Sequence, residues 1–366
     1  MLAPTTGALL LAAFLGAPTA AQLRDPQLVR ALEASELDLS GEALLPDVLA
    51  SIEKQTGNRL VDFRQQFNQD TDEVRVVFDH TEKEFWPVVD AMLDNTGLDL
   101  YPYSGEGAMA VVRREADLGL RKGRAVYSGP FRLDVTNIYA HSDLRSLKPG
   151  SLQLELEISW EPKVKPLALS QPLAALTVLA DDSSWVRPST MVESLDVEVQ
   201  PGSYAAELTV PLELPRRDIS MIASLEGQMV ALVPEEVTEF RFQDLESEDD
   251  DTNTQTTGGI RVALEGVRRN QELWELRMRV TILSDDSRLL SATSWLFQNL
   301  TYLETADGEK IDHAGLETTM QSENELGLAY FFDAPGELSE YDWVYRSPTN
   351  VGLVPVEFEL RNIPLP

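Results

Sequence analysis

Apolar residues in the first third of the chain recur at helical spacing in two places. Residues 43–56 hold them at i, i+3, i+4 and i+7, and these are Leu45, Val48, Leu49 and Ile52. Residues 84–96 repeat the pattern with Phe85, Val88, Val89, Met92 and Leu93. Each segment ends in a Thr-Gly pair, and Gly57 and Gly97 suit the left-handed position that follows a helix. The pattern predicts two amphipathic helices, each stopped by its glycine.

Strand-like segments separate and follow the two predicted helices. They are residues 59–63, 73–79, 98–103 and 108–113. Thr81 and Glu84 have the spacing of a capping box in front of the second helix. The order helix, strand, strand, helix, strand, strand predicts a small α+β domain over residues 36–115, in which two helices cover a small sheet.

This region resembles the secretin and TonB short N-terminal domain, abbreviated STN. The resemblance covers about residues 36–113 and lies in Leu37-Asp38-Leu39-Ser40, in Gln55-Thr56-Gly57-Asn58, in the strand Val74 to Phe78 and in the segment Phe85 to Leu98. It implies a periplasmic module that makes protein-protein contacts ahead of an outer-membrane pore or receptor. The residues after 113 depart from the pattern of such pores and receptors, so the resemblance implies only a periplasmic interaction module.

From residue 125 onward, alternation with a period of two replaces the helical pattern. Residues 152–160 place Leu152, Leu154, Leu156, Ile158 and Trp160 on one face, which predicts a half-buried strand. The segment Ala306-Asp307-Gly308-Glu309 is typical of a hairpin turn. We expect two antiparallel β-sandwiches, at residues 125–246 and 260–366. The polar, acidic segment 247–259 predicts a flexible linker between them.

Three pairs of similar segments occur in the same order in the two halves of this β-rich region. Phe131–Ile138 is similar to Ile260–Val267, Leu176–Leu179 to Leu300–Leu303, and Val230–Leu245 to Val351–Ile363. The pairs indicate an internal duplication of the sandwich. Generic alternation of strand residues is the alternative explanation.

The N-terminus has the pattern of a secretory signal peptide over residues 1–21. An apolar run at residues 8–17 is followed by small residues before the first charge at Arg24, although no lysine or arginine precedes the run. A short buried helix is the alternative, because the run is too short to span a bilayer. Residues 22–35 are expected to form a helical lead. We therefore expect a soluble protein in the periplasm or outside the cell.

The charge of the chain narrows the classes of partner. The formal net charge is −31, and such a surface repels nucleic acid and anionic membranes. The acidity is explained by solubility of an exported protein; a basic partner or divalent cations are the alternatives. The chain has no cysteine, which excludes disulfides, thiolate nucleophiles and zinc fingers.

The sequence contains no constellation that names a reaction. His80, His141 and His313 fall in three different expected domains, and His141-Ser142-Asp143 are loop neighbours that cannot form a catalytic relay. The acidic run Glu248–Asp251 lacks the alternating ligands and the glycine of a calcium loop, so a solvated linker is favoured over loose calcium binding. We predict no catalytic, cofactor-binding or metal-binding residue and no cofactor.

Five tryptophans of the β-rich region are candidates for either core packing or a sugar-binding face. They are Trp160, Trp185, Trp274, Trp295 and Trp343, and Trp160 favours the core because it continues an apolar strand face. The leading hypothesis is an exported, non-catalytic protein-interaction or structural module of the cell envelope that binds an exported or envelope protein. A carbohydrate-binding sandwich protein is the second hypothesis, and a carboxylate-dependent hydrolase is the third.

Overall fold

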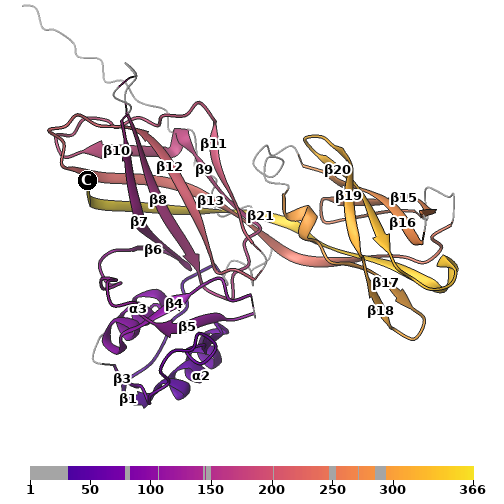
Figure 1. Cartoon of the computed structure of the whole chain (residues 1–366), viewed down its shortest axis with the longest axis horizontal. Coiled ribbons are helices and arrows are strands. Elements are labelled where there is room, and N and C mark those ends of the chain that lie inside the picture. The colour runs from indigo at the N-terminus through magenta and orange to yellow at the C-terminus, as the bar shows by residue number, and fades with distance from the viewer. Residues whose placement is uncertain are drawn as a thin grey trace, which may run out of the picture.

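The computed structural model describes residues 32–78, 83–105, 107–142, 145, 150–200, 202–246, 253–270, 272–284 and 294–366. They form a helical module near the N-terminus and two β-sandwich-like bodies that follow one another along the long axis of the molecule (Figure 1). The mostly β character agrees with the β-rich fold expected from the sequence. The predicted signal peptide, His80, Thr81, Asp143 and the run Glu248–Asp251 lie outside the described residues.

The N-terminal module, which we define as residues 32–113, contains both predicted helices. They are α2 (Leu45–Thr56) and α3 (Phe85–Thr96), and the glycines that end them have the expected left-handed φ of 75° at Gly57 and 67° at Gly97. The capping box was a wrong prediction, because the N-cap of α3 is Glu84 and its side chain makes no capping hydrogen bond. The described part of the predicted helical lead, residues 32–35, forms a turn and a bend instead of a helix.

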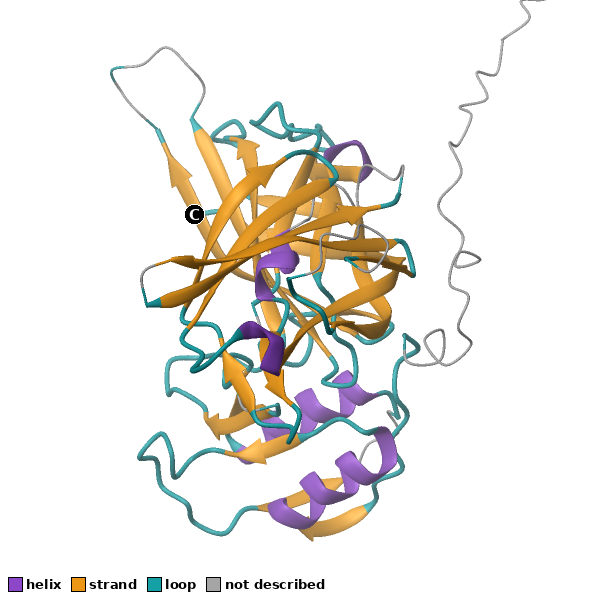
Figure 2. Ribbon diagram, turned by 90° about the vertical axis from the view of Figure 1, so that its right-hand side faces the viewer, coloured by secondary structure: helices purple, strands orange, loops and turns teal. Residues whose placement is uncertain are grey.

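The strands of the N-terminal module form two sheets, where the sequence predicted a single one. The strands are β1 (Gly41–Leu44), β2 (Leu60–Asp62), β3 (Arg75–Phe78), β4 (Leu98–Tyr101) and β5 (Met109–Arg113). β1 pairs with β3, whereas β2, β5 and β4 form a second sheet in which β2 and β5 run parallel. Both helices lie below the β-sandwich bodies in Figure 2.

The first sandwich is built on a four-stranded sheet with the order β12-β8-β7-β6. Its strands are β6 (Val126–Ser128), β7 (Phe131–His141), β8 (Ser151–Trp160) and β12 (Ala205–Glu213). The predicted alternation in β8 is confirmed, because Leu152, Leu154, Leu156, Ile158 and Trp160 are all buried. The facing strands are β9 (Ala168–Pro172), β10 (Leu176–Ala180) and β11 (Ser194–Glu198), with the short helix η2 (Leu173–Ala175) between β9 and β10.

The second sandwich has a five-stranded sheet with the order β14-β15-β16-β20-β19. Its strands are β14 (Thr254–Thr257), β15 (Ile260–Asn270), β16 (Leu273–Ile282), β19 (Gly315–Gln321) and β20 (Glu325–Phe332). The facing strands include β17 (Thr301–Thr305) and β18 (Lys310–Asp312), which form the predicted hairpin around Gly308. Two short helices, η3 (Ser294–Gln298) and η4 (Leu338–Glu340), complete this body.

Two long strands run through both sandwiches and join them. β13 (Met221–Phe242) and β21 (Tyr341–Pro364) pair antiparallel along their whole length, from Met221 opposite Pro364 to Phe242 opposite Trp343. Both belong to one seven-stranded sheet that also contains β9, β10 and β11 of the first sandwich and β17 and β18 of the second. The C-terminus therefore lies in the first sandwich, far from the body that precedes it in sequence (Figure 1).

This exchange of strands corrects the predicted boundaries at residues 125–246 and 260–366. Val356, Phe358 and Leu360 of β21 belong to the core of the first sandwich, whereas Phe240 and Phe242 of β13 belong to the core of the second. The described end of the predicted linker 247–259 is also ordered into a strand, because β14 pairs with β15. Each sandwich is consequently completed by a strand from the other half of the sequence.

The two sandwiches share local irregularities at matching positions. β7 is bulged between Val135 and Asn137, and β15 is bulged between Leu264 and Gly266. In each case the bulge falls at the sixth residue of its strand. β10 then pairs with β13, as β17 pairs with β21.

The shared strands predict which sandwich depends on the C-terminal residues. Leu360 is 3% exposed in the core of the first sandwich, so Leu360→Ala is expected to destabilise the protein by about 2–5 kcal/mol through loss of packing. Hydrogen exchange should increase in peptides from β8 and stay unchanged in peptides from β16. Faster exchange in β16 with an unchanged β8 is the result expected of two sequential domains, and it would contradict the strand exchange.

Candidate functional site

The residues that the sequence singled out do not converge on one site. His141 ends β7 and is exposed, whereas His313 packs its ring against Tyr330 at 5.1 Å between ring centroids. Of the five tryptophans, Trp160, Trp274, Trp295 and Trp343 are buried, and Trp185 is 58% exposed. Among the described residues, no group of three His, Cys, Asp or Glu side chains is arranged to hold a metal ion.

A buried charge network joins the N-terminal module to the first sandwich. Asp90 of α3 is completely buried, and its carboxylate accepts hydrogen bonds from Arg121 Nε at 2.7 Å and from Arg132 Nε of β7 at 2.9 Å. The hydroxyl of Tyr127 in β6 donates to the same carboxylate at 2.9 Å. Arg132 is itself 1% exposed and also reaches Asp134 at 3.2 Å. Because both side chains are almost completely buried, each depends on charged and hydrogen-bonding partners within the protein.

The electrostatics of Asp90 follow from this geometry. Burial by itself raises the pKa of Asp90, but the charges and hydrogen bonds of Arg121 and Arg132 outweigh burial and hold that pKa below its usual range. The pKa of the Tyr127 hydroxyl is raised by burial and by the nearby charge of Asp90. Asp90 is therefore ionised and fixed at neutral pH, which suits a structural link and not a general acid or base.

A second buried carboxylate ties the start of the module to the same sandwich. Glu161, in the loop after β8, is completely buried and accepts from the backbone N of Ser35 at 2.8 Å and from its Oγ at 2.5 Å. It also accepts from Asn58 Nδ2 at 2.6 Å, and Asn58 Oδ1 accepts from the backbone N of Lys163 at 2.9 Å. Trp86 of α3 adds a hydrogen bond from Nε1 to the carbonyl of Pro130 at 2.8 Å. The module and the first sandwich thus share one continuous core.

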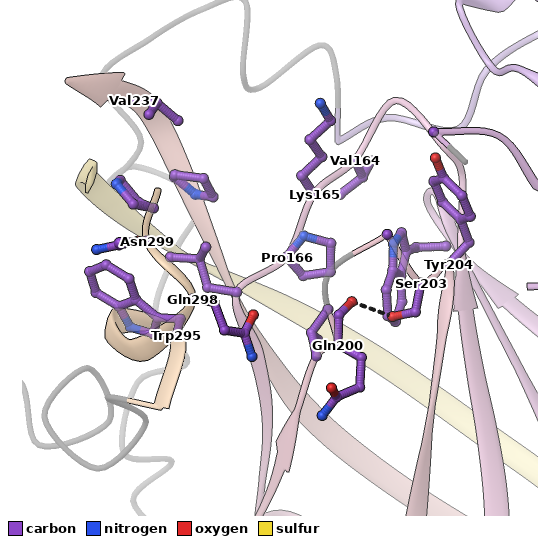
Figure 3. Close-up of a pocket in the computed structure, with 17 residues that line it drawn as sticks. Val164, Lys165, Pro166, Gln200, Ser203, Tyr204, Val237, Trp295, Gln298 and Asn299 are labelled. Carbon is purple, nitrogen blue, oxygen red and sulfur yellow. Dashed lines mark hydrogen bonds between the residues drawn. The ribbon is translucent and has the colours of Figure 1, made fainter. Parts of the chain in front are cut away.

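A cavity lies where the module and the two sandwiches meet. It has a volume of about 370 Å³ and falls within the range of small-ligand pockets (Figure 3). The module contributes Gly107, and the first sandwich contributes Trp160, the loop Val164–Leu167 and Tyr204. We call this space the junction cavity.

The opposite wall of the junction cavity comes from the second sandwich and from the shared strands. Trp295 of η3 and Asn299 face Pro166 across the space in Figure 3, and Val237 of β13 lies at its edge with 52% of its surface exposed. Trp295 is 2% exposed, and its Nε1 finds no hydrogen-bond acceptor in the described part of the chain. Asn299 Nδ2 donates to Tyr345 Oη at 2.7 Å, which fixes the amide at the wall.

The lining of the junction cavity is suited to binding an apolar group. Lys165 and Tyr204 are its titratable side chains, and burial raises the pKa of Tyr204 further above neutrality. Among the described residues that line it there is no His, Asp or Glu. Apolar side chains, prolines, glycines, amides and Ser203 make up the rest, and the apolar share is typical of sites that hold an apolar group.

The sequence analysis identified neither Asp90 nor Glu161 as a functional residue. For Asp90, one pattern in the sequence could have done so. Asp90 is the single acid among the apolar residues in the middle of α3, where the helix is buried nearly all round. An acid in such a helix requires a buried cation. For Glu161 no local signal exists, because Ser35 and Asn58, which donate hydrogen bonds to it, lie more than a hundred residues away.

The charge network predicts the effect of removing Asp90. Asp90→Asn removes the counter-charge that Arg121 and Arg132 share and leaves each of them one aspartate partner, Asp99 or Asp134, and we expect a loss of about 3–5 kcal/mol in the free energy of unfolding. Because the folded-state pKa of Asp90 is lowered, the stabilisation is present above about pH 4 and declines as pH falls through the lowered value. Urea unfolding from pH 7 to pH 3 measures both effects. The exposed Asp117→Asn is the control, and equal losses in the two variants would contradict the role of Asp90.

No helix among the described residues has both the length and the apolar character needed to cross a membrane. Comparison of the chain with models of protein families, with curated proteins and with solved structures gave no match. The functional conclusion therefore rests on the geometry of the site.

Proposed function

We propose that the chain is an exported, non-catalytic protein-interaction module of the cell envelope and that its partner is held at the junction cavity. The observation that carries the proposal is the apolar lining of this cavity by all three bodies. A partner that places an apolar side chain there contacts the N-terminal module and both sandwiches at once. The signal-peptide pattern at residues 1–21 and the resemblance of residues 36–113 to the STN domain support an envelope location.

The fixed position of the N-terminal module refines the role that the STN resemblance implies. A module linked through Asp90 and Glu161 to the first sandwich does not move as an independent docking domain. We infer that recognition involves a composite surface of module and sandwich. The rigid assembly loses little conformational freedom on binding, which favours affinity.

We further propose that the two sandwiches arose by duplication of one unit. The matching bulges in β7 and β15 support this origin. The similar segments Val230–Pro234 and Val351–Pro355 support it independently, because they pair with each other around Leu232 opposite Leu353. Two copies of one unit that exchanged their last strands across a twofold axis produce this register.

One tryptophan of the β-rich region remains a candidate for binding carbohydrate. Trp185 follows β10, is 58% exposed and carries the guanidinium of Arg187 at 5.8 Å from its ring centroid. Exposed tryptophan is suited to stacking on a sugar ring. The other four tryptophans of the β-rich region are buried, so a tryptophan-lined sandwich face is not available for this role.

The proposed function predicts that blocking the junction cavity abolishes binding. Val237→Arg adds a long charged side chain at the edge of the cavity, and we expect affinity for an apolar fluorescent probe such as N-phenylnaphthylamine to fall by about tenfold. The recovery of the envelope partner by affinity capture should fall with it. Fluorescence titration and quantitative capture from envelope extracts measure the two effects.

Val77→Arg is the matched control for this experiment. Val77 is 50% exposed, close to the 52% of Val237, and lies in β3, outside the lining of the junction cavity. It should leave both probe and partner binding unchanged. Equal binding by the Val237→Arg variant and the wild-type protein would overturn the proposed function.

The carbohydrate alternative predicts a different outcome. Trp185→Ala should abolish any quenching or shift of tryptophan fluorescence that a panel of glycans produces, because the other tryptophans of the sandwiches are buried. A panel that leaves the fluorescence of the wild-type protein unchanged removes this alternative.

A further inference from the structure

Three partly exposed aromatic side chains form a row on the N-terminal module. Phe67 lies in the turn after β2, Tyr101 ends β4, and Tyr103 lies in the turn that follows. Their exposed fractions are 43%, 38% and 39%. The ring centroids are 5.1 Å apart between Phe67 and Tyr101 and 5.9 Å apart between Tyr101 and Tyr103. The three rings therefore form one continuous surface.

The aromatic row ends beside two carboxylates of the first sandwich. Glu157 of β8 and Glu207 of β12 are directly opposite each other in the antiparallel register. Burial, followed by the charges of Glu157 and Glu207, raises the pKa of Tyr103 to about 12. The charges of both carboxylates thus act on the Tyr103 hydroxyl, and the hydrogen bond from the backbone N of Tyr204 to the carbonyl of Pro102 at 2.8 Å holds the turn of Tyr103 beside the start of β12.

These two carboxylates lack the counter-charges that their neighbours have. Asp90, Asp94, Asp99 and Asp134 each pair with an arginine. Among the described residues, neither Glu157 nor Glu207 forms an ion pair, and the hydrogen bond from Ser159 Oγ at 3.2 Å is the one that Glu157 accepts. Burial raises the pKa of Glu157, and the charges of Arg132 and Arg121 offset that effect only in part.

The arrangement of Glu157 and Glu207 costs the folded protein stability. Like charges directly opposite on neighbouring strands repel each other, and a partly buried carboxylate loses hydration. Asp134, opposite Glu157 on the other side, lengthens the row of acids across three strands. Like charges that oppose folding and form no ion pair among the described residues are characteristic of a binding surface.

We propose that the surface formed by Phe67, Tyr101, Tyr103, Glu157 and Glu207 binds an extended basic segment of a partner protein. A lysine or arginine of that segment lies between the two carboxylates and against the ring of Tyr103, where ion pairing and a cation–π contact act together. Flanking apolar side chains of the segment cover Tyr101 and Phe67. We call this the aromatic-acidic surface.

The length and the charge of this surface favour a peptide over a small cation. A strand advances about 3.3 Å per residue, so the two ring-to-ring steps correspond to about three or four residues of extended chain. A single ammonium ion occupies only the carboxylate end. The net charge of −31 adds long-range attraction for a basic partner and increases its rate of association.

The orientation of the rings disfavours a carbohydrate at this surface. Phe67 and Tyr101 are inclined by 64°, and Tyr101 and Tyr103 by 73°, so the rings do not present a flat succession of faces. A neutral sugar also leaves the charges of Glu157 and Glu207 uncompensated. A basic side chain can pack against a single ring and also compensates the charges of the two carboxylates.

The aromatic-acidic surface is distinct from the junction cavity. The turn between β4 and β5 separates them, because Tyr103 lies at its start and Gly107, near its end, lines the cavity. The backbone N of Tyr204 donates to the carbonyl of Pro102 at 2.8 Å, which fixes this turn on the first sandwich. Failure of binding at one site therefore leaves the other testable.

The test measures binding of labelled six-residue peptides to the full mature chain by fluorescence anisotropy. The first peptide alternates lysine and leucine, and in the second and third every lysine is replaced by glutamine or by glutamate. We expect binding of the lysine peptide alone, a tenfold weaker affinity in the Glu207→Gln variant, and a comparable loss in Tyr103→Ala. Higher salt should weaken the interaction.

Glu213→Gln is the matched control, because Glu213 is exposed at the far end of the same strand, β12, and on the same face as Glu207. It should bind the lysine peptide like the wild-type protein. If Glu207→Gln and Glu213→Gln weaken binding equally, the loss of affinity is explained by net charge alone, and the proposed site is wrong. Absence of binding, or tighter binding of a neutral oligosaccharide that Tyr103→Ala abolishes, would overturn it as well.

The stability of the Glu157→Gln variant gives a second, independent measurement. If Glu157 serves binding and not stability, the Glu157→Gln variant should have a melting temperature about 1–3 °C higher than the wild-type protein, because the repulsion between Glu157 and Glu207 is removed. A lower melting temperature would show that Glu157 is a structural partner of Arg132, and it would contradict the proposal.

Discussion

The antiparallel pairing of β13 with β21 is the interaction on which the rest of the structure depends. Each strand completes the core of one sandwich with its first half and the core of the other with its second half. Neither sandwich is therefore complete without the residues of the other half of the sequence. The junction cavity is a consequence of the same pairing, because Pro234, Val237 and Pro348 line it at the point where the two strands pass between the bodies.

The attachment of the N-terminal module follows a different physical logic. The sandwiches are joined by backbone pairing and apolar packing, whereas the module is held by buried carboxylates that need specific partners. In another docking geometry Asp90 loses one of its two arginine partners, and Glu161 loses its hydrogen bonds from Ser35 and Asn58, so the network favours one docking geometry and penalises the others. That geometry brings Tyr103 to Glu157 and Glu207, and Gly107 to the junction cavity.

The local elements were largely accessible from the sequence, because each depends on a few neighbouring residues. The apolar face of α2, the glycine stops at Gly57 and Gly97, and the alternation of β8 are all written in short patterns. Strand exchange is a pairing between residues more than a hundred positions apart, and its local pattern is the same as that of two independent sandwiches. The sequence therefore predicted sandwiches with the wrong boundaries.

The candidate sites were inaccessible for the same reason. The junction cavity combines Gly107, Trp160 and Trp295 from three bodies, and no spacing in the sequence relates them. Glu157 and Glu207 were two acids among 61, and only the register of β8 with β12 selects them as a pair. They differ from their surroundings, because the nearby aspartates pair with arginines, whereas these two glutamates form no ion pair within the described ranges.

Strand exchange and duplication together explain a coincidence in the sequence. The similar segments Val230–Pro234 and Val351–Pro355 are also the segments that cross from one sandwich to the other and pair around Leu232 and Leu353. Generic strand alternation gives no reason for two similar segments to be each other's partner. In the duplication that we propose, both segments occupy equivalent positions between the sandwiches, and each packs against the other. A substitution in one of the two segments changes the packing of the other, whereas the same substitution in both keeps the two packing environments alike. The pairing of the segments therefore preserves their similarity in sequence.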